Sequence, residues 1–227
     1  MSIVSVQGIT RTYIQGRHEV HALRGIDLEI GPGEFMALMG PSGSGKTTLL
    51  NLIGGLDTPT DGKVEIEGTD LSTLDGGALS DLRRDRVGFV FQAYNLVPVL
   101  SAVENAEMVL VLRGNDAEER RKRVLHTLAE VGLTGLEHRR PSALSGGEQQ
   151  RVAVARAITG EPALVLADEP TANLDSTTGS ELIGLMRRLN REKGITFVFA
   201  THDPKVMEAA ERVVRLVDGR IVSDERR

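Results

Sequence analysis

The chain has 227 residues, with 27 Lys and Arg against 32 Asp and Glu, a formal net charge of −5, and no cysteine. The lack of cysteine excludes disulfides, zinc–thiolate sites and iron–sulfur clusters, and the mild acidity argues against a general nucleic-acid-binding protein. With 40% apolar and 26% charged residues, the composition is that of a globular protein, and the length suits one domain with room for a small inserted lobe.

The sequence predicts no membrane-spanning segment. The first residues lack a basic stretch followed by an apolar run, so we expect no secretory signal. The longest apolar runs, such as residues 108–112 and 163–167, are far shorter than the roughly 20 residues that a transmembrane helix needs. We therefore expect any connection to a membrane to go through a partner protein.

Short apolar runs typical of strands alternate with amphipathic stretches typical of helices, which predicts an α/β domain. Early in the chain, apolar and polar residues alternate with period two, and this pattern suits an antiparallel layer beside a parallel core. In chain order we expect a strand at 3–6, a strand at 23–30, a strand at 35–39, a helix at 46–54, a strand at 63–67 and a strand at 87–91.

The second half of the chain begins with charged sequence of helical pattern at residues 101–140. The stretch of about 93–143 is therefore predicted to form a mostly helical lobe, inserted into a core made of residues 1–92 and 144–227. The other expected elements are core strands at 163–167, 195–200 and 213–217, a helix at 176–192, and a hairpin turn at Asp218 and Gly219.

A glycine-rich loop at residues 40–47 matches G-x-x-x-x-G-K-[ST] between a predicted strand and a predicted helix. Its glycines let backbone N–H groups point at phosphate oxygens, and the helix N-terminus adds its positive end. Lys46 supplies a charge for the β- and γ-phosphates and Thr47 a hydroxyl for Mg²⁺, which a plain flexible turn would not explain. The expected nucleotide contacts are Gly40, Ser42, Gly43, Ser44, Gly45, Lys46, Thr47 and Thr48.

A second motif places two acids at the end of an apolar strand, at Asp168 and Glu169. Because a buried, unpaired carboxylate is costly, such a strand ends in acids only where charge is needed or where they cap the next segment. Beside a phosphate-binding loop, we expect Asp168 to hold Mg²⁺ through water and Glu169 to polarise an attacking water.

A third motif lies at residues 144–149, where Ser145 and Glu148 have the spacing of a capping box for the helix that follows. The capping box does not explain Gly146 and Gly147, which lower helix stability in the first turn. Bare glycines at a helix start allow a phosphate to approach the backbone N–H groups closely.

Taken together, these motifs resemble the nucleotide-binding subunit of an ABC (ATP-binding cassette) transporter, and the resemblance covers nearly the whole chain. It implies a P-loop NTPase core with a mainly parallel sheet, an antiparallel β layer and an inserted helical lobe. It also implies ATP and Mg²⁺ as cofactors.

The resemblance assigns further residues. Residues 144–149 resemble the family's signature sequence, which implies nucleotide contacts from Ser145, Gly146, Gly147 and Glu148. Gln92 resembles the glutamine that contacts Mg²⁺ or the attacking water, and Asp175 belongs to a segment that resembles the D-loop. His202 resembles the switch histidine that reaches the γ-phosphate, and Tyr13 resembles the aromatic residue that stacks on adenine. The alternatives are an ordinary strand-end histidine and an ordinary aromatic residue. His18, His21, His126 and His138 receive no functional role.

Residues 83–92, 95–98 and 166–175 narrow the resemblance to one branch, which includes lipoprotein-release (LolD-type), macrolide-export (MacB-type) and cell-division (FtsE-type) ATPases. The membrane partners of this branch have few helices and often a large extracytoplasmic domain. Residues 93–112 are where such subunits usually contact their partner, but their apolar side chains could equally form the core of the lobe.

The resemblance implies that two copies of the chain pack head to tail, with each ATP between the loop of one copy and residues 145–149 of the other. Glu169, Lys46, Gln92 and His202 would then be the catalytic residues, and Thr47, Gln92 and Asp168 the metal ligands. We expect an ATP-hydrolysing subunit on the cytoplasmic face of the cell membrane, held there by an integral membrane permease.

Lipoprotein release or macrolide and peptide export is the favoured function. The first alternative is an ATPase that regulates a cell-envelope enzyme through a transmembrane partner. A soluble ABC ATPase of repair or translation is disfavoured, because the chain has neither a long coiled-coil insertion nor a second cassette. No nucleic-acid partner is expected.

Overall fold

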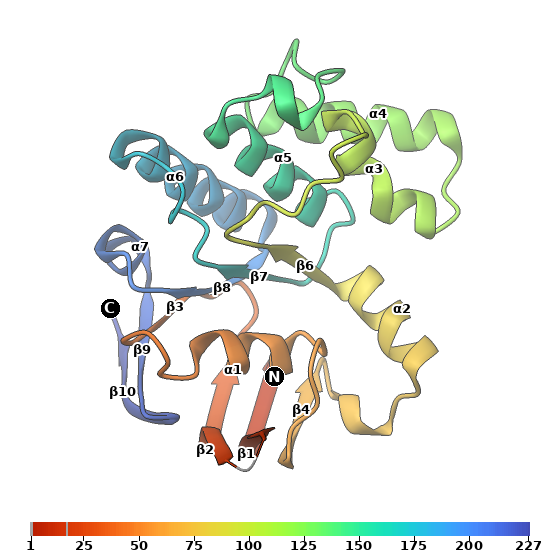
Figure 1. The fold of residues 1–227 in the computed structure, drawn as a ribbon. Coiled ribbons are helices and arrows are strands. Elements are labelled where there is room, and N and C mark those ends of the chain that lie inside the picture. The colour runs from red at the N-terminus through yellow and green to blue at the C-terminus, as the bar shows by residue number, and fades with distance from the viewer. Residues whose placement is uncertain (1, 17) are drawn as a thin grey trace.

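The fold is built on two β-sheets with a helix between them and further helices packed on the larger sheet (Figure 1). We describe it from a computed structural model, which covers residues 2–16 and 18–227. The smaller sheet is antiparallel and has the strand order β2-β1-β4-β5. The larger has the order β10-β9-β3-β8-β7-β6 and is parallel except for β10.

The strands are β1 (Val4–Gln15), β2 (His18–Ile30), β3 (Phe35–Met39), β4 (Asp61–Ile66), β5 (Thr69–Asp70), β6 (Val87–Val90), β7 (Leu164–Asp168), β8 (Thr196–Thr201), β9 (Arg212–Val217) and β10 (Arg220–Arg226). The α-helices are α1 (Lys46–Ile53), α2 (Gly76–Arg86), α3 (Ala102–Leu112), α4 (Ala117–Glu130), α5 (Gly146–Ile158), α6 (Ser176–Lys193) and α7 (Pro204–Ala209), and single 3₁₀ turns lie at Leu71–Thr73 and Pro141–Ala143. None of the helices in the described parts of the chain has the length and apolar character that crossing a bilayer requires.

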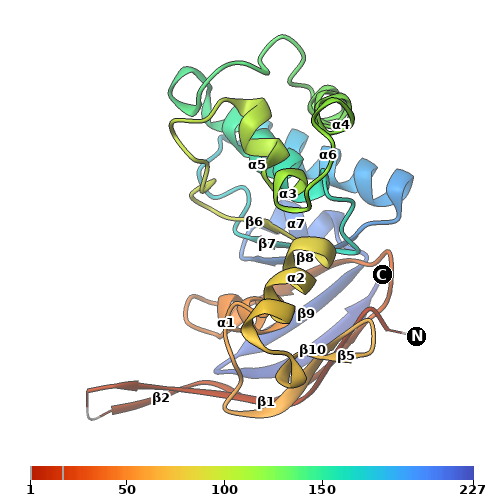
Figure 2. The same ribbon diagram turned by 90° about the vertical axis from the view of Figure 1, so that its right-hand side faces the viewer.

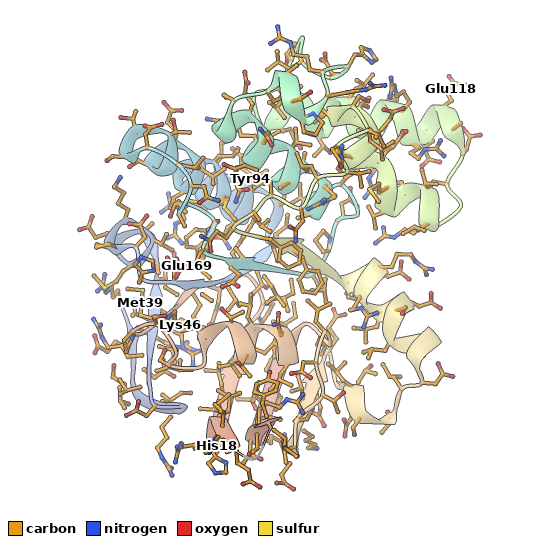
Figure 3. The ribbon with its side chains drawn as sticks, in the orientation of Figure 1. His18, Met39, Lys46, Tyr94, Glu118 and Glu169 are labelled. Atoms are coloured by element: carbon orange, nitrogen blue, oxygen red, sulfur yellow. The ribbon has the colours of Figure 1, made fainter. Side chains whose placement is uncertain are left out.

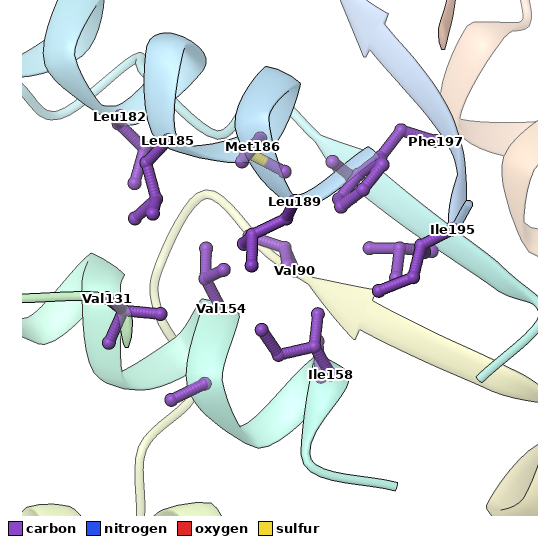
Figure 4. Packing of buried hydrophobic residues seen from close by; sticks show 14 of the residues in the cluster. Val90, Val131, Val154, Ile158, Leu182, Leu185, Met186, Leu189, Ile195 and Phe197 are labelled. Atoms are coloured by element: carbon purple, nitrogen blue, oxygen red, sulfur yellow. The ribbon is translucent and has the colours of Figure 1, made fainter. Parts of the chain in front are cut away.

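The larger sheet separates two hydrophobic clusters, because successive side chains of a strand point to opposite faces. In β3, Phe35 and Ala37 join the cluster under α5 and α6, whereas Met36 and Leu38 join the cluster that contains α1 and the smaller sheet. Figure 4 shows the first cluster, in which the apolar stripe of α6 packs against α5 and the sheet. The continuous apolar runs, from which core strands were predicted, therefore form strands that are covered on both faces of the sheet.

The parallel pairing brings four strand ends to one edge. The loop before α1 follows β3, His202 follows β8, Glu169 follows β7, and Gln92 comes shortly after β6. Because β3, β8, β7 and β6 are neighbours that run in the same direction, their carboxyl ends meet, and this is where open α/β sheets bind ligands.

The predicted α/β class, with a parallel core and an antiparallel layer, is confirmed. The first two strands are much longer than the predicted 3–6 and 23–30, and they form a ribbon that projects from the body of the molecule (Figure 2). From Thr10 to Ile14 the side chains of β1 are no longer buried, so the sequence there carries no apolar alternation although the backbone pairs.

Several elements were not predicted from the sequence. Helix α2 buries none of its residues, and it is defined by Asp75, whose side chain accepts from the N–H of Ala78, and by arginines in its last turn. Helix α7 and strands β5 and β10 were also not predicted. Within the predicted helical stretch, α3 and α4 are present, but residues 131–140 are not helical.

We predict opposite effects of alanine at two glycines. In β6, a Cβ on Gly88 would lie 2.4 Å from the carbonyl oxygen of Ala157, so Gly88→Ala should lower the free energy of unfolding by about 1–3 kcal/mol. In α6, Gly184 is exposed and a Cβ there meets nothing within 4 Å. Gly184→Ala should therefore raise the free energy of unfolding by about 0.5–1 kcal/mol. Urea unfolding measures both, and equal effects would contradict the packing argument.

Candidate functional site

A cleft of about 780 Å³ opens at the carboxyl edge of the larger sheet. Figure 3 labels Lys46 and Glu169, two of the residues that line it. The cleft brings together five of the predicted features from distant parts of the chain. It is lined by Tyr13, Val20, His21, Ala22, residues 41–48, Gln92, Glu169, Ala172 and His202.

The glycine-rich loop wraps tightly around its own lysine. Lys46 is buried, and its Nζ donates to the carbonyl oxygens of Gly40 at 2.8 Å and Pro41 at 3.0 Å. A Cβ on Gly40 would lie 2.2 Å from the carbonyl oxygen of Leu216, and Gly45 has a φ of 101°, so both positions require glycine. The buried Oγ of Ser44 has no hydrogen-bond partner among the described residues. Helix α1 begins here without a side-chain cap, which leaves its first N–H groups to the cleft.

Asp168, the last residue of β7, is hydrogen-bonded to the loop but is not among the residues that line the cleft. The hydroxyl of Thr47 donates to its Oδ1 at 3.0 Å. Burial raises the pKa of the Asp168 carboxyl above its ordinary value, and the hydrogen bond from Thr47 acts in the opposite direction. The nearby charge of Glu169 raises the same pKa, and Lys46 lowers it. The folded chain therefore destabilises the charged form of this carboxyl relative to water.

The Glu169 carboxylate accepts hydrogen bonds at both oxygens. The hydroxyl of Thr201 donates to Oε2 at 2.9 Å, and Nδ1 of His202 lies 2.7 Å from Oε1. Glu169 is mostly buried, whereas the His202 side chain is 74% exposed. Glu169 has a φ of 46°, in the left-handed region that non-glycine residues rarely adopt, and such backbone strain is concentrated at functional sites.

Two amides fasten the segment after β6 to the loop after β7. The side chain of Asn173 donates to the carbonyl oxygen of Gln92 at 2.8 Å. The wholly buried Gln150, from α5, donates to the carbonyl oxygen of Pro170 at 2.8 Å and, at 3.5 Å, to that of Phe91. No role was predicted for Thr201 or Gln150, and Asn173 was predicted only as part of the segment that resembles the D-loop. Each acts through hydrogen bonds to distant segments, and its residue type gives no signal in the sequence.

Tyr13 reaches the cleft from the β1–β2 ribbon. Its hydroxyl donates to Oδ2 of Asp57 at 2.7 Å, and the guanidinium of Arg11 lies over its ring at 4.5 Å from the centroid. The ring is thus fixed on one side and lines the cleft on the other.

The predicted signature residues do not line the cleft. Ser145 and Glu148 form the expected capping box at the start of α5. Gly146 and Gly147 have an explanation inside the chain, because a Cβ on Gly147 would lie 2.5 Å from Cγ2 of Thr178 and one on Gly146 would lie 2.9 Å from the hydroxyl of Tyr94. The glycines alone therefore do not indicate a bound phosphate.

Asp175, predicted to contact nucleotide, caps α6 instead of lining the cleft. Its Oδ1 accepts from the N–H groups of Thr177 and Thr178 at 3.0 Å each, and its Oδ2 accepts from the Thr178 hydroxyl. These hydrogen bonds lower the pKa of its carboxyl. Within this chain Asp175 is a helix cap.

Residues 93–112 contribute both to the lobe and to its surface. Leu96 and Val109 pack against the main cluster, whereas Val99 and Leu112 are 68% and 69% exposed. Met108 and Leu112 line a groove of about 440 Å³ between α2, β6, α3 and the end of α5. Part of this segment therefore belongs to the core of the lobe, and contact of its exposed side chains with a partner stays a prediction.

Comparison with known proteins gives close relatives over the whole length. A lipoprotein-releasing system ATP-binding protein LolD of Anaeromyxobacter dehalogenans is 49% identical over 97% of this chain and 93% of that protein. A macrolide export ATP-binding/permease protein MacB of Sodalis glossinidius is 46% identical over 99% of this chain, which spans only 34% of that protein.

Structural comparison agrees. The dimeric structure of a post-hydrolysis state of the ATP-binding cassette MJ0796, bound to ADP and Pi, has a TM-score of 0.91 and 45% identity, and the match covers 98% of both chains. The model of the ABC transporter family matches residues 23–172. The chain therefore belongs to the ABC transporter family, as one of its ATP-binding and ATP-hydrolysing cassettes.

Proposed function

We propose that this cassette powers a transporter of the lipoprotein-release or macrolide-export type by hydrolysing ATP in the cleft. The observation that carries the proposal is that one cleft holds both a phosphate-binding loop and Glu169, a carboxylate oriented by two hydrogen bonds. The relatives of LolD and MacB type support the class of transporter.

The loop has the groups that a triphosphate needs. Lys46 exchanges the carbonyl oxygens of Gly40 and Pro41 for phosphate oxygens, because a charged acceptor gives a stronger hydrogen bond. The unpartnered Oγ of Ser44 and the uncapped N-terminus of α1 supply further donors. Tyr13 offers an aromatic face for adenine.

The residues at the end of β7 fit Mg²⁺. No three His, Cys, Asp or Glu side chains of the described residues gather as metal ligands, and Mg²⁺ at a nucleotide needs only one or two carboxylates beside phosphates and water. The hydroxyl of Thr47 lies 3.0 Å from Oδ1 of the half-buried Asp168, whose pKa is raised by burial although Lys46 lowers it. We propose that Thr47, Asp168 and Gln92 hold the ion, which neutralises charge that develops on the phosphates.

Glu169 is placed to act as the general base. A water positioned by Gln92 and Glu169 attacks the γ-phosphorus, its proton passes to a carboxylate oxygen of Glu169, and the bond to the bridging oxygen of ADP breaks. His202 contacts the same carboxylate and is exposed enough to turn toward the γ-phosphate. Thr201 keeps the second oxygen of Glu169 in place.

A second copy of the chain completes the site in this proposal. Ser145–Glu148 lie away from the cleft of their own chain, and the MJ0796 cassette is a dimer. The hydroxyl oxygen of Ser145 accepts from the N–H of Glu148, and the hydroxyl also hydrogen-bonds the Glu148 carboxylate. A phosphate of the neighbouring copy would replace that carboxylate as the acceptor of the hydroxyl proton. We propose the head-to-tail arrangement that the family resemblance implies.

A permease attaches at the groove below α3, on the inner face of the membrane. The groove combines apolar side chains of Met108 and Leu112 with arginines of α2, and it ends at Phe91, next to Gln92. Binding there is therefore transmitted to the cleft through the Gln92 backbone and Asn173. We propose that residues 93–143 move as a lobe in this coupling.

Removal of one charge should stabilise the empty cleft. Because the pKa of Asp168 is higher in the folded chain than in the unfolded chain, its charge lowers the free energy of unfolding. This loss of stability is complete above the pKa of the folded state and absent below the pKa of the unfolded state. Asp168→Asn keeps an acceptor for Thr47 and should raise the melting temperature at pH 7.5 without nucleotide. The gain should shrink as the pH falls toward 4, and a gain independent of pH would contradict the assignment. Added Mg²⁺ and ATP should stabilise the wild type more than the variant.

Glu169→Gln should keep ATP binding and lose hydrolysis, because an amide of similar shape is a poor base. We expect turnover to fall by at least about 100-fold, with an ATP-bound dimer accumulating in size-exclusion chromatography. Lys46→Ala is the matched control and should lose nucleotide affinity itself. Rapid hydrolysis by Glu169→Gln would refute the role of Glu169.

The groove can be tested by capture of the partner. Tagged Glu169→Gln with ATP and Mg²⁺ should retain a multi-spanning membrane protein from source-cell membranes in mild detergent. Adding Leu112→Glu places a charge in the groove and should abolish capture, whereas Leu125→Glu, on an exposed position of α4 outside the groove, should not. Recovery of only soluble proteins would overturn the membrane assignment, and capture unaffected by Leu112→Glu would move the docking site elsewhere.

A further inference from the structure

Tyr13 is held from behind by an arginine. The Cζ of Arg11 lies 4.5 Å from the centroid of the Tyr13 ring, and Arg11 is not among the residues that line the cleft. Tyr13 does line it. One face of the ring is therefore covered by the guanidinium, and the cleft side remains for a ligand.

Asp57 fixes both of these side chains at once. Its two oxygens accept from Nε of Arg11 at 3.0 Å and from Nη2 at 2.7 Å, and Oδ2 also accepts from the Tyr13 hydroxyl at 2.7 Å. The side chains of Arg11 and Asp57 are only 22% and 23% exposed, so water competes weakly for these contacts. Such a planar two-point pair fixes orientation as well as distance.

Packing alone would not orient the Tyr13 ring. The ribbon that carries it leaves the core, and its neighbours Ile14 and Val20 are 78% and 43% exposed. Asp57, by contrast, follows shortly after α1, the helix whose first residue is Lys46. The same helix thus links the phosphate-binding loop to the residue that holds the ring.

We propose that Arg11 and Asp57 are positioning residues for the nucleotide base, which hold Tyr13 as a preformed stacking platform with one open face. The proposal rests on ATP binding in the cleft and adds the residues that make the chain favour a base-bearing triphosphate. When the Tyr13 side chain is already ordered before binding, no binding free energy is lost in ordering it. Removal of Arg11 or Asp57 should therefore weaken ATP binding by about 3- to 10-fold.

Two ligands separate positioning from general damage. ATP uses both the loop and the platform, whereas inorganic tripolyphosphate uses the loop alone. Both are titrated calorimetrically with Mg²⁺ into the full chain, as wild type, Arg11→Met, Asp57→Asn and Tyr13→Phe. Lys63→Met is the matched control, because it removes another ion pair of the same sheet, with Glu65 at 2.8 Å, outside the cleft.

We expect Arg11→Met and Asp57→Asn to bind ATP about 3- to 10-fold more weakly, with tripolyphosphate affinity unchanged. Tyr13→Phe keeps the ring and loses only the hydroxyl, so it should show a smaller loss. Unchanged ATP affinity, or an equal loss for both ligands, would overturn the positioning role. A wild type that binds neither ligand would instead overturn the proposed function.

Fluorescence gives an independent readout, since the chain has two tyrosines and no tryptophan. In a Tyr94→Phe background Tyr13 is the only tyrosine. ATP should quench it while tripolyphosphate does not, and Arg11→Met should reduce the quenching at saturating ATP. Equal quenching by the two ligands would show that no base stacks on the ring.

Discussion

The parallel pairing of β3, β8, β7 and β6 is the constraint on which the cleft depends. These strands are almost wholly buried, so their polar neighbours emerge only where the strands end. Because the strands share a direction, Lys46, Glu169, His202 and Gln92 reach one edge from distant parts of the sequence. A register shift of one residue would both displace these groups and exchange the side chains of the two hydrophobic clusters.

The charged groups of the cleft already have internal partners. Lys46 donates to backbone carbonyls, Asp168 accepts from Thr47, and Glu169 accepts from Thr201 and contacts His202. Partners of this kind are what allow charges to be buried at all. A bound nucleotide therefore replaces hydrogen bonds within the chain by stronger ones, and each contact adds only modestly to the binding free energy. Selection of a triphosphate must come from many contacts made together.

Motifs formed by residues that lie close together in the sequence could be identified from the sequence alone. The glycine-rich loop and the acids Asp168 and Glu169 at the end of an apolar run could be placed correctly at the strand ends, although their roles stay predictions. The outer ribbon could not be predicted, because pairing without burial leaves no apolar period. Thr201 and Gln150 were missed, and the hydrogen bond of Asn173 to Gln92 was not foreseen, for a related reason: these hydrogen bonds join segments far apart in the chain.

The close approach of Gly147 to Thr178 means that the residue type at each of these positions restricts the residue type at the other. Any side chain at 147 would press on Cγ2 of Thr178 and push α5 away from the start of α6. A larger residue at 147 is thus admissible only together with a smaller one at 178, and the two should covary among related chains whether or not a nucleotide touches them. Retention of glycine at 147 across such chains therefore measures helix packing as much as ligand recognition.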